Sequence, residues 1–314
     1  MKRVLLASLL FACGPVEETG QASARILSGT PDETDTSVVA ILVASANGPQ
    51  FDSICSGTVV SPHAVLTAAH CFSPDVVGPI DHVQIFLGDD AGDPNELSDP
   101  ANLVDVAETD PNPSFDVNAG TNDVAVVVAA ATLPPTPMPM SHDSLGSGDV
   151  GAPVHAVGYG ESVDGDDLSG GVRRSADTTI FSVDDEHLSL DDVICFGDSG
   201  GPTFATKNGA LTVVGVHSGG TSNSCVGIGE DTRVDLYASS FVDPIVNRVD
   251  PGFLPPDGCN ESGGSGDAWL VALALGLRAI ARPWPTRPRS SKPRSATSRS
   301  SSTPTRCPSP PATS

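Results

Sequence analysis

Residues 195–202 of this chain have the sequence CFGDSGGP, which places Ser199 between glycines on both sides. Glycines let the backbone turn sharply, and they leave bare N–H groups that a substrate carbonyl can approach. A serine in such a turn is what an exposed nucleophile requires. Unrelated hydrolases share the Gly-x-Ser-x-Gly pattern, and a glycine-rich turn also produces it without any chemistry. Motifs elsewhere in the chain are therefore needed to identify the fold that contains this serine.

Two further motifs hold residues that could serve a nucleophilic serine. TAAHC presents His70, and NDVAVVV presents Asp123 at the entrance of an apolar strand. A serine hydroxyl needs a base within hydrogen-bond reach, and a histidine supplies one near neutral pH. The order along the chain is His, Asp, Ser. Subtilisin-type enzymes run Asp, His, Ser and α/β-hydrolases run Ser, Asp, His, and His217 follows Ser199 too closely for the latter order.

The body of the chain is strongly acidic. The 314 residues have a formal charge of −23, and residues 26–259 hold 35 Asp and Glu against five Lys and Arg. A negative surface disfavours nucleic acid and anionic membranes as partners. Two interpretations of this charge stay open. The acidic residues could keep the protein soluble, or they could attract basic substrates. Aromatic residues make up only 4% while Gly and Pro number 32 and 28, so we expect an all-β chain of short strands and turns.

The motifs around His70, Asp123 and Ser199 resemble the histidine, aspartate and serine boxes of the trypsin/chymotrypsin family of serine proteases. Their order is the one that this family uses, and the resemblance extends over residues 26–249. It implies two six-stranded antiparallel β-barrels with the three residues in the cleft between them. A short C-terminal helix is expected over residues 235–249. The resemblance also implies a serine endopeptidase that acts on protein or peptide substrates as a monomer, with no cofactor and no metal.

The same resemblance assigns a role to each residue of the site. His70 would take the proton of the Ser199 hydroxyl and pass it to the leaving amine. Asp123 would hold the histidine ring in one tautomer and stabilise its charged form. The backbone N–H groups of Gly197 and Ser199 would form the oxyanion hole.

A specificity pocket is also implied by the resemblance. It would have a base residue six positions before the nucleophile, two wall glycines, and a serine beside the triad: Val193, Gly220, Gly229 and Ser218. An apolar base predicts a weak preference for apolar residues before the scissile bond. Asp191 and Asp192 flank that base and Asp231 lies near the pocket, so a preference for basic residues stays open.

Four of the seven cysteines lie in the body of the chain. The resemblance pairs Cys55 with Cys71, beside His70, and Cys195 with Cys225, beside the specificity pocket. Paired cysteines behind an export leader are typical of structural disulfides in an oxidising compartment. None of the cysteine spacings predicts zinc.

Activation is expected at the Arg25-Ile26 junction, because family members are cut before an Ile or Val. The freed α-ammonium of Ile26 would then pair with the buried carboxylate of Asp198 and order the oxyanion hole. An activating protease is therefore an expected partner. Ser28 stands where relatives usually have a glycine, and the alternative is that Arg25 is a plain linker residue.

The first 13 residues combine a basic start with a short apolar run, as in a signal peptide. The sequence LFAC resembles a bacterial lipobox, which predicts lipidation of Cys13, and ordinary cleavage near Ala12 is the alternative. Residues 14–25 are expected to be a linker or pro-segment. The protein is thus expected to be exported, either as an outer-membrane or cell-surface lipoprotein or in secreted form.

The C-terminal segment begins with a linker over residues 250–267. A cysteine at position 259, a small-residue spacer and an apolar run over 268–281 resemble the start of a myxobacterial C-terminal sorting signal. Membrane contact is expected only through such an anchor or a lipid. Residues 282–314 form a basic tail of the composition typical of disorder. A frameshift in the source gene and a genuine basic tail both account for it.

Three further alternatives stay open. The acidic loop 89–99 could hold calcium through hard oxygen ligands, although it lacks EF-hand spacing, and a solvated loop is the other interpretation. A trypsin-like fold without activity could serve as a binding or adhesion module. An esterase could use the same triad.

Overall fold

The computed structural model describes residues 29–46, 51, 53–191, 194–220 and 225–255. Within these residues the chain forms 13 strands and three short α-helices. Several predicted features lie outside the described residues and stay predictions: the leader with Cys13, the Arg25-Ile26 junction, Asp192, Val193, and the segments beyond residue 255.

The first barrel is built from strands rich in buried valine, isoleucine and alanine, and its closed order is β2-β3-β4-β7-β6-β5. Every residue of β2 except the last is buried, because one face packs in the barrel and the other meets neighbouring elements. The strands are β2 (Val38–Ser45), β3 (Ser53–Ser61), β4 (Ala64–Thr67), β5 (Ile80–Phe86), β6 (Leu103–Pro111) and β7 (Ala125–Ala129).

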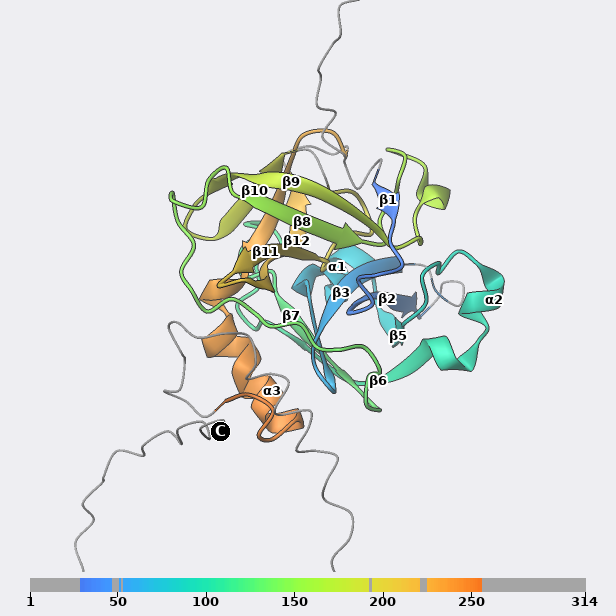
Figure 1. Cartoon of the computed structure of the whole chain (residues 1–314). Coiled ribbons are helices and arrows are strands. Elements are labelled where there is room, and N and C mark those ends of the chain that lie inside the picture. Colours follow the sequence, from blue (N-terminus) through green and yellow to red (C-terminus); the bar gives the residue numbers. More distant parts are fainter. Residues whose placement is uncertain (1–28, 47–50, 52, 192–193, 221–224, 256–314) are drawn as a thin grey trace, which may run out of the picture.

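The second barrel closes when β8 pairs with both β9 and β11. The short strand β1 (Thr30–Pro31) pairs with β9 from outside. A two-residue turn joins β11 to β12, and Asn208 and Gly209 both have positive φ there, as such hairpins require. The strands are β8 (Pro153–Gly158), β9 (Arg174–Val183), β10 (His187–Asp191), β11 (Pro202–Lys207), β12 (Ala210–Gly220) and β13 (Ile228–Arg233). The predicted pair of six-stranded antiparallel barrels is confirmed (Figure 1).

The helices are short. They are α1 (Pro74–Val77), α2 (Pro94–Leu97) and α3 (Asp243–Val249), and 3₁₀ turns cover Ala69–Phe72, Pro100–Asn102, Asp167–Ser169 and Val234–Leu236. The closing α-helix begins later than the expected residue 235, after one π-helical turn, Ala238–Val242. Pro244 explains the start, because proline lacks an N–H and fits only the first turn of a helix. No helix in the described part of the chain is long and apolar enough to cross a membrane.

Helix α3 lies against the first barrel (Figure 1), and Val242 and Val246 join that barrel's apolar core. The chain after α3 is fixed by Asp250. Its Oδ2 accepts hydrogen bonds from the Ser61 hydroxyl at 2.6 Å and from the His63 backbone N–H at 2.9 Å. The C-terminal end of the domain is thus bound to the turn between β3 and β4.

Arg173 is buried where strand β1 and the two barrels meet, with only 1% of its surface exposed. Its Nε donates to the Asp32 carbonyl at 3.0 Å, and Nη1 donates to the Val38 carbonyl at 3.2 Å and the Tyr159 hydroxyl at 3.0 Å. Nη2 forms an ion pair with Asp89. A buried charge is tolerated only with such partners, so this guanidinium ties the N-terminal segment to both barrels.

His155 makes a second connection to the N-terminal segment. Its Nε2 lies 3.0 Å from Asp35 Oδ2, and its Nδ1 lies 2.7 Å from Asp177 Oδ1. These carboxylates, Asp35 foremost, raise the pKa of His155 to about 9 against the opposing effect of burial. The imidazole is therefore charged at neutral pH and links residues before β2 to strand β9.

The acidic loop 89–99 contains α2 and is organised by its own carboxylates. Glu96 Oε2 accepts hydrogen bonds from the backbone N–H groups of Asp89 and Asp90, at 2.9 and 3.2 Å. Asp93 caps α2 by accepting from the Asn95 N–H at 2.8 Å. Asp99 caps the next turn in the same way. These bonds are local caps, and the Ala91 N–H, which donates to the Gly171 carbonyl at 2.8 Å, also attaches the loop to the chain before β9.

Candidate active site

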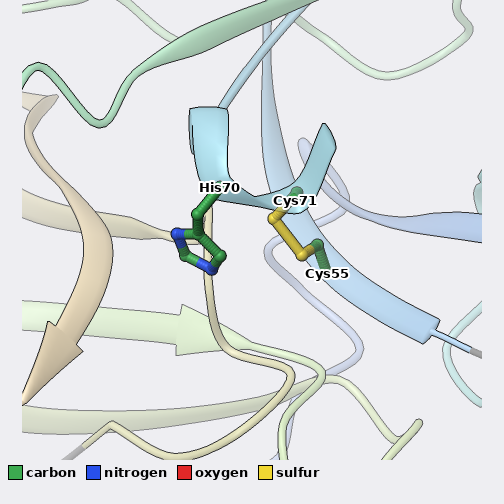
Figure 2. Close-up of side chains that lie close together, drawn as sticks. All are labelled: Cys55, His70 and Cys71. Atoms are coloured by element: carbon green, nitrogen blue, oxygen red, sulfur yellow. A yellow bond between two sulfur atoms is a disulfide. The ribbon is translucent and has the colours of Figure 1, made fainter. Parts of the chain in front are cut away.

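His70 lies on the 3₁₀ turn that follows β4. The Cys55–Cys71 disulfide binds this turn to β3 (Figure 2), as the resemblance implied. The two sulfur atoms are bonded to each other, so they are not ligands for a metal beside His70. Only 16% of the histidine side chain is exposed, and the turn therefore fixes the ring in a largely enclosed position.

Asp123 is almost fully buried against that histidine. Its Oδ1 accepts from the His70 backbone N–H at 2.8 Å, and its Oδ2 lies 2.7 Å from His70 Nδ1. The Ser218 hydroxyl donates to Oδ2 at 2.5 Å. Burial acts to raise the pKa of the Asp123 carboxyl, and the bonds from His70 and Ser218 outweigh it, so the pKa is lowered. A carboxylate only accepts hydrogen bonds, so Nδ1 holds the ring proton and Nε2 of the neutral ring is the basic nitrogen.

Ser199 lies in the glycine-rich turn before β11. Gly197 and Gly200 adopt φ values of +93° and +83°, which side chains other than glycine rarely tolerate. A Cβ at position 200 would also lie 2.0 Å from Thr67 Oγ1. The Ser199 carbonyl accepts from the Ser56 N–H at 2.7 Å, so the first barrel supports the turn.

Two backbone N–H groups of this turn are free for a ligand. Neither the Gly197 N–H nor the Ser199 N–H donates to another described residue. The Gly197 carbonyl accepts from the Ser56 hydroxyl at 2.9 Å, which fixes the orientation of the following peptide unit. A pair of fixed, unused donors beside a serine hydroxyl is suited to a developing oxyanion.

His70 and Ser199 line one hollow of about 250 Å³. In the described part of the chain the serine hydroxyl makes no hydrogen bond to the histidine ring; such bonds are often long in ligand-free sites. The predicted wall residues Ser218, Gly220 and Gly229 also line this hollow. The structure therefore brings together the predicted triad and the described part of the predicted pocket.

Ile194 is a pocket residue that sequence analysis missed. It lines the hollow, and a Cβ at Gly229 would lie only 2.4 Å from its Cγ1. Because glycine has no side chain at position 229, Ile194 can occupy the space beside it. No local pattern in the sequence signals this role. The Cys195–Cys225 disulfide, also as implied by the resemblance, borders the same hollow.

His217 and Asp231 form a second buried pair beside the pocket. His217 Nδ1 lies 2.8 Å from Asp231 Oδ1, and both side chains are at most 1% exposed. Burial acts to lower the pKa of His217, but Asp231 and Asp198 raise it on balance. Asp231 is not among the residues that line the hollow. Its carboxylate faces an imidazole, which leaves it poorly placed to select a basic substrate side chain.

Asp198 is fully buried behind the serine turn. Its Oδ1 accepts from the Gly160 N–H at 2.8 Å and its Oδ2 from the Cys195 N–H at 2.9 Å. Burial raises the pKa of this carboxyl to about 6, despite the opposing effects of His217 and the backbone bonds. Gly158 and Gly160 leave it room, because a Cβ at either position would lie within 2.6 Å of the carboxyl group. Its predicted partner Ile26 lies outside the described residues.

Two antiparallel barrels that hold a histidine, an aspartate and a serine at one hollow define the class of chymotrypsin-like proteins. Residues 27–241 match the family model described as Trypsin. The chain therefore belongs to the trypsin family.

Two curated relatives show how far this similarity extends. The chain is 25% identical over 265 residues to urokinase-type plasminogen activator of Gallus gallus, which covers 72% of this chain and 58% of that protein. It is 28% identical over 270 residues to phenoloxidase-activating enzyme 1 of Spodoptera litura, which covers 76% and 69%. The chain thus spans less than two thirds of the length of the first of these relatives.

Solved structures show the same fold. Human heparin binding protein superimposes with a TM-score of 0.55 at 20% identity, covering 72% of this chain and 98% of that one. A mutant of the same protein gives a TM-score of 0.56 at 18% identity, covering 71% and 98%. At these identities the likeness concerns the fold alone.

Proposed function

We propose that this protein is an exported serine endopeptidase that uses His70, Asp123 and Ser199. The observation that carries the proposal is the Asp123–His70 contact of 2.7 Å, which leaves Nε2 of a neutral imidazole unprotonated in the hollow that also contains Ser199. The family of the chain supports the reaction class, since its curated relatives are named as an activator of plasminogen and an activator of phenoloxidase.

The mechanism follows from the geometry. Ser199 Oγ attacks the carbonyl carbon of the scissile peptide while His70 Nε2 takes the hydroxyl proton. The carbonyl oxygen becomes an oxyanion and accepts hydrogen bonds from the Gly197 and Ser199 N–H groups. His70 then gives its proton to the leaving amine, and an acyl group stays on Ser199. A water molecule repeats the sequence and releases the acid, with Asp123 ionised throughout.

The pocket is proposed to prefer apolar residues before the scissile bond. Ile194 lies against Gly229 inside the hollow, and Val193 precedes it in the chain. Asp231, which could have favoured a basic residue, is buried against His217. The pocket groups that would face the substrate residue before the scissile bond are therefore mainly apolar. Burying an unpaired charge of the substrate among them would be unfavourable.

Activation is proposed to require cleavage between Arg25 and Ile26. The fully buried Asp198 carboxyl, whose pKa burial raises to about 6, would be stabilised in its charged form by a cation. The new α-ammonium of Ile26 is the cation we propose. Its arrival would fix the peptide unit between Asp198 and Ser199, which carries the Ser199 donor of the oxyanion hole.

Export is proposed from the leader, by lipidation at Cys13 or by ordinary cleavage. A lipid on Cys13 would be separated from the protease by cleavage after Arg25, so activation would release the enzyme. An anchor in the apolar segment 268–281 would instead keep it on the cell surface. Fractionation before and after activation distinguishes these outcomes.

A binding module without activity is the second candidate. Two of the solved structures that share the fold are of a heparin-binding protein. Heparin is a polyanion, and the acidic body of this chain repels polyanions. The acidic charge of this chain therefore favours a protease over a heparin-binding module. An esterase would use the same three residues, so the charge does not distinguish it from a protease.

The test is covalent labelling of the full chain with an organophosphate or sulfonyl fluoride after cleavage at Arg25. We expect one adduct on Ser199, turnover of a peptide substrate, and loss of both in Ser199→Ala. Absence of an adduct from the cleaved protein would contradict the proposal. Parallel assays on peptides and simple esters separate an endopeptidase from an esterase, and a peptide library varied before the scissile bond tests the apolar preference.

A further inference from the structure

Asn122, immediately before Asp123, has an unusual backbone conformation. Its φ is +56°, and Asn208 in the β11–β12 hairpin is the only other non-glycine residue with positive φ in the described part of the chain. The Val124 N–H donates to the Asn122 carbonyl at 2.9 Å, which closes a three-residue turn centred on Asp123. Such a conformation persists only where the surroundings hold it. The direction of the Asp123 side chain thus depends on what holds Asn122.

The group that holds Asn122 comes from the other barrel. Glu186, in the turn between β9 and β10, accepts the Asn122 backbone N–H on Oε1 at 2.6 Å. The Tyr237 hydroxyl contacts the same Oε1 and lies 3.2 Å from the Asn122 side-chain oxygen. Burial and Glu186 raise the pKa of Tyr237, so this hydroxyl keeps its proton and donates. Oε1 of Glu186 therefore accepts two hydrogen bonds, one from the Asn122 N–H and one from the Tyr237 hydroxyl.

The turn that carries Glu186 is itself fixed. Asp184 Oδ1 accepts from the backbone N–H groups of Glu186 and His187, at 2.8 and 2.7 Å. The Arg233 N–H donates to the Glu186 carbonyl at 3.1 Å. His187 Nε2 lies 3.0 Å from the Gly120 carbonyl, a second contact with the loop before Asp123. The turn that contains Glu186 and His187 in the second barrel thus binds the loop before Asp123 in the first barrel.

We propose that Glu186 is a positioning residue for Asp123, acting through the backbone of Asn122, and this inference rests on the proposed function of the triad. Asp123 has to meet both the backbone N–H and Nδ1 of His70, at 2.8 and 2.7 Å. That arrangement depends on the backbone of the turn, and small misplacements of catalytic groups cost much of the rate. Glu186 touches neither the reacting atoms nor His70.

Two substitutions separate the hydrogen bond from the charge. Glu186→Asp keeps the charge but withdraws the carboxylate by one methylene from Asn122. Glu186→Gln loses the charge but keeps Oε1, which can still accept from both Asn122 and Tyr237. Asp185→Ala is the matched control, because it removes a charge from an exposed position of the same turn.

The experiment measures kcat and KM of the cleaved full-length protein, with thermal unfolding of each variant. It also follows the low-field proton resonance of His70 Nδ1–H, which reports the contact with Asp123. We expect Glu186→Asp to lower kcat about tenfold with KM little changed and to shift or broaden that resonance. Glu186→Gln and Asp185→Ala should stay within a few-fold of the unmodified protein.

Equal losses in Glu186→Asp and Glu186→Gln would overturn the inference in favour of a charge effect. An unchanged kcat and an unchanged resonance in Glu186→Asp would overturn it as well. If Glu186→Asp does not fold, Tyr237→Phe removes the second donor, and the inference then requires a several-fold fall in kcat without a change in KM.

Failure of the proposed function has a different signature. The unmodified cleaved protein would then neither turn over a peptide nor be labelled on Ser199. The His70 resonance is measurable without turnover, so it continues to test whether Glu186 sets the Asp123–His70 contact.

Discussion

The hydroxyl of Ser218 lies 2.5 Å from Oδ2 of Asp123. Ser218 belongs to β12 of the second barrel, and Asp123 precedes β7 of the first. The carboxylate that orients His70 is therefore shared across the cleft, and each barrel contributes part of its hydrogen bonding.

Removing this hydroxyl should weaken catalysis without abolishing it. In Ser218→Ala the Asp123 carboxylate keeps both bonds from His70 but loses one donor, so we expect kcat to fall roughly tenfold or less. Steady-state kinetics on the cleaved enzyme measure the change. Ser144→Ala, at an exposed position, is the control. An unchanged kcat in Ser218→Ala would mean that the bond has no role in turnover.

Glycine at position 200 should be essential for the fold of the serine turn. Gly200→Ala combines a φ of +83° with a Cβ contact of 2.0 Å to Thr67 Oγ1. We expect it to lower the free energy of unfolding by about 3 kcal/mol or more. Gly209→Ala has a similar φ of +81° but no atom within 4 Å of the new Cβ, so it should cost about 1 kcal/mol. Denaturant unfolding measures both, and equal losses would contradict the steric argument.

The charged His155 should make stability fall at alkaline pH. Its pKa is raised to about 9 in the folded protein, chiefly by Asp35, so the folded state binds its proton more tightly than the unfolded chain does. The contribution is complete below pH 6.5 and is lost as pH rises through 9, about 2 kcal/mol after allowing for partial exposure.

The check is the free energy of unfolding at pH 6.5 and at pH 9. His155→Gln should show a smaller fall between the two than the unmodified protein does. His82→Gln, at an exposed ring, should leave the fall unchanged. A fall of the same size in His155→Gln would assign the pH dependence to other groups.

Loss of the buried guanidinium should be costly. Arg173→Met would remove the ion-pair partner of Asp89 and the guanidinium donors to the Asp32 carbonyl and the Tyr159 hydroxyl. We expect a loss of roughly 2–3 kcal/mol in the free energy of unfolding, because buried acceptors lose their donors. Arg248→Met is the control, because Arg248 makes exposed ion pairs with Glu108 and Asp110 and its loss should matter far less. Similar losses in the two variants would rule out a special role for burial.

Much of the fold could be predicted from the sequence because its signals are local. TAAHC and GDSGGP each hold a reactive residue within a few positions of the disulfide or glycine that fixes it. The apolar run after Asp123 predicted strand β7, and all five residues of that strand are buried. These features depend on backbone chemistry over a few residues.

The missed features depend on register and on long-range contact. His217 meets Asp231 because β12 and β13 pair in one register with an irregularity just beyond His217. Glu186 and Asn122 are 64 positions apart and lie in different barrels. Ile194 was missed because its role comes from the empty space at Gly229, which no local pattern reports. The closing helix was expected too early, because the preceding turns are held by tertiary packing.

The contact between Glu186 and Asn122 joins the two barrels, and the division of the site between them has a consequence for folding. His70 and Asp123 lie in the part of the chain that forms the first barrel, whereas Glu186, Ser199 and Ser218 lie in the part that forms the second. A chain of which only the first barrel has been made therefore holds the proposed base without the proposed nucleophile, and the second barrel on its own lacks the base. With the proposed roles, hydrolytic chemistry therefore begins only when the two barrels have docked against each other.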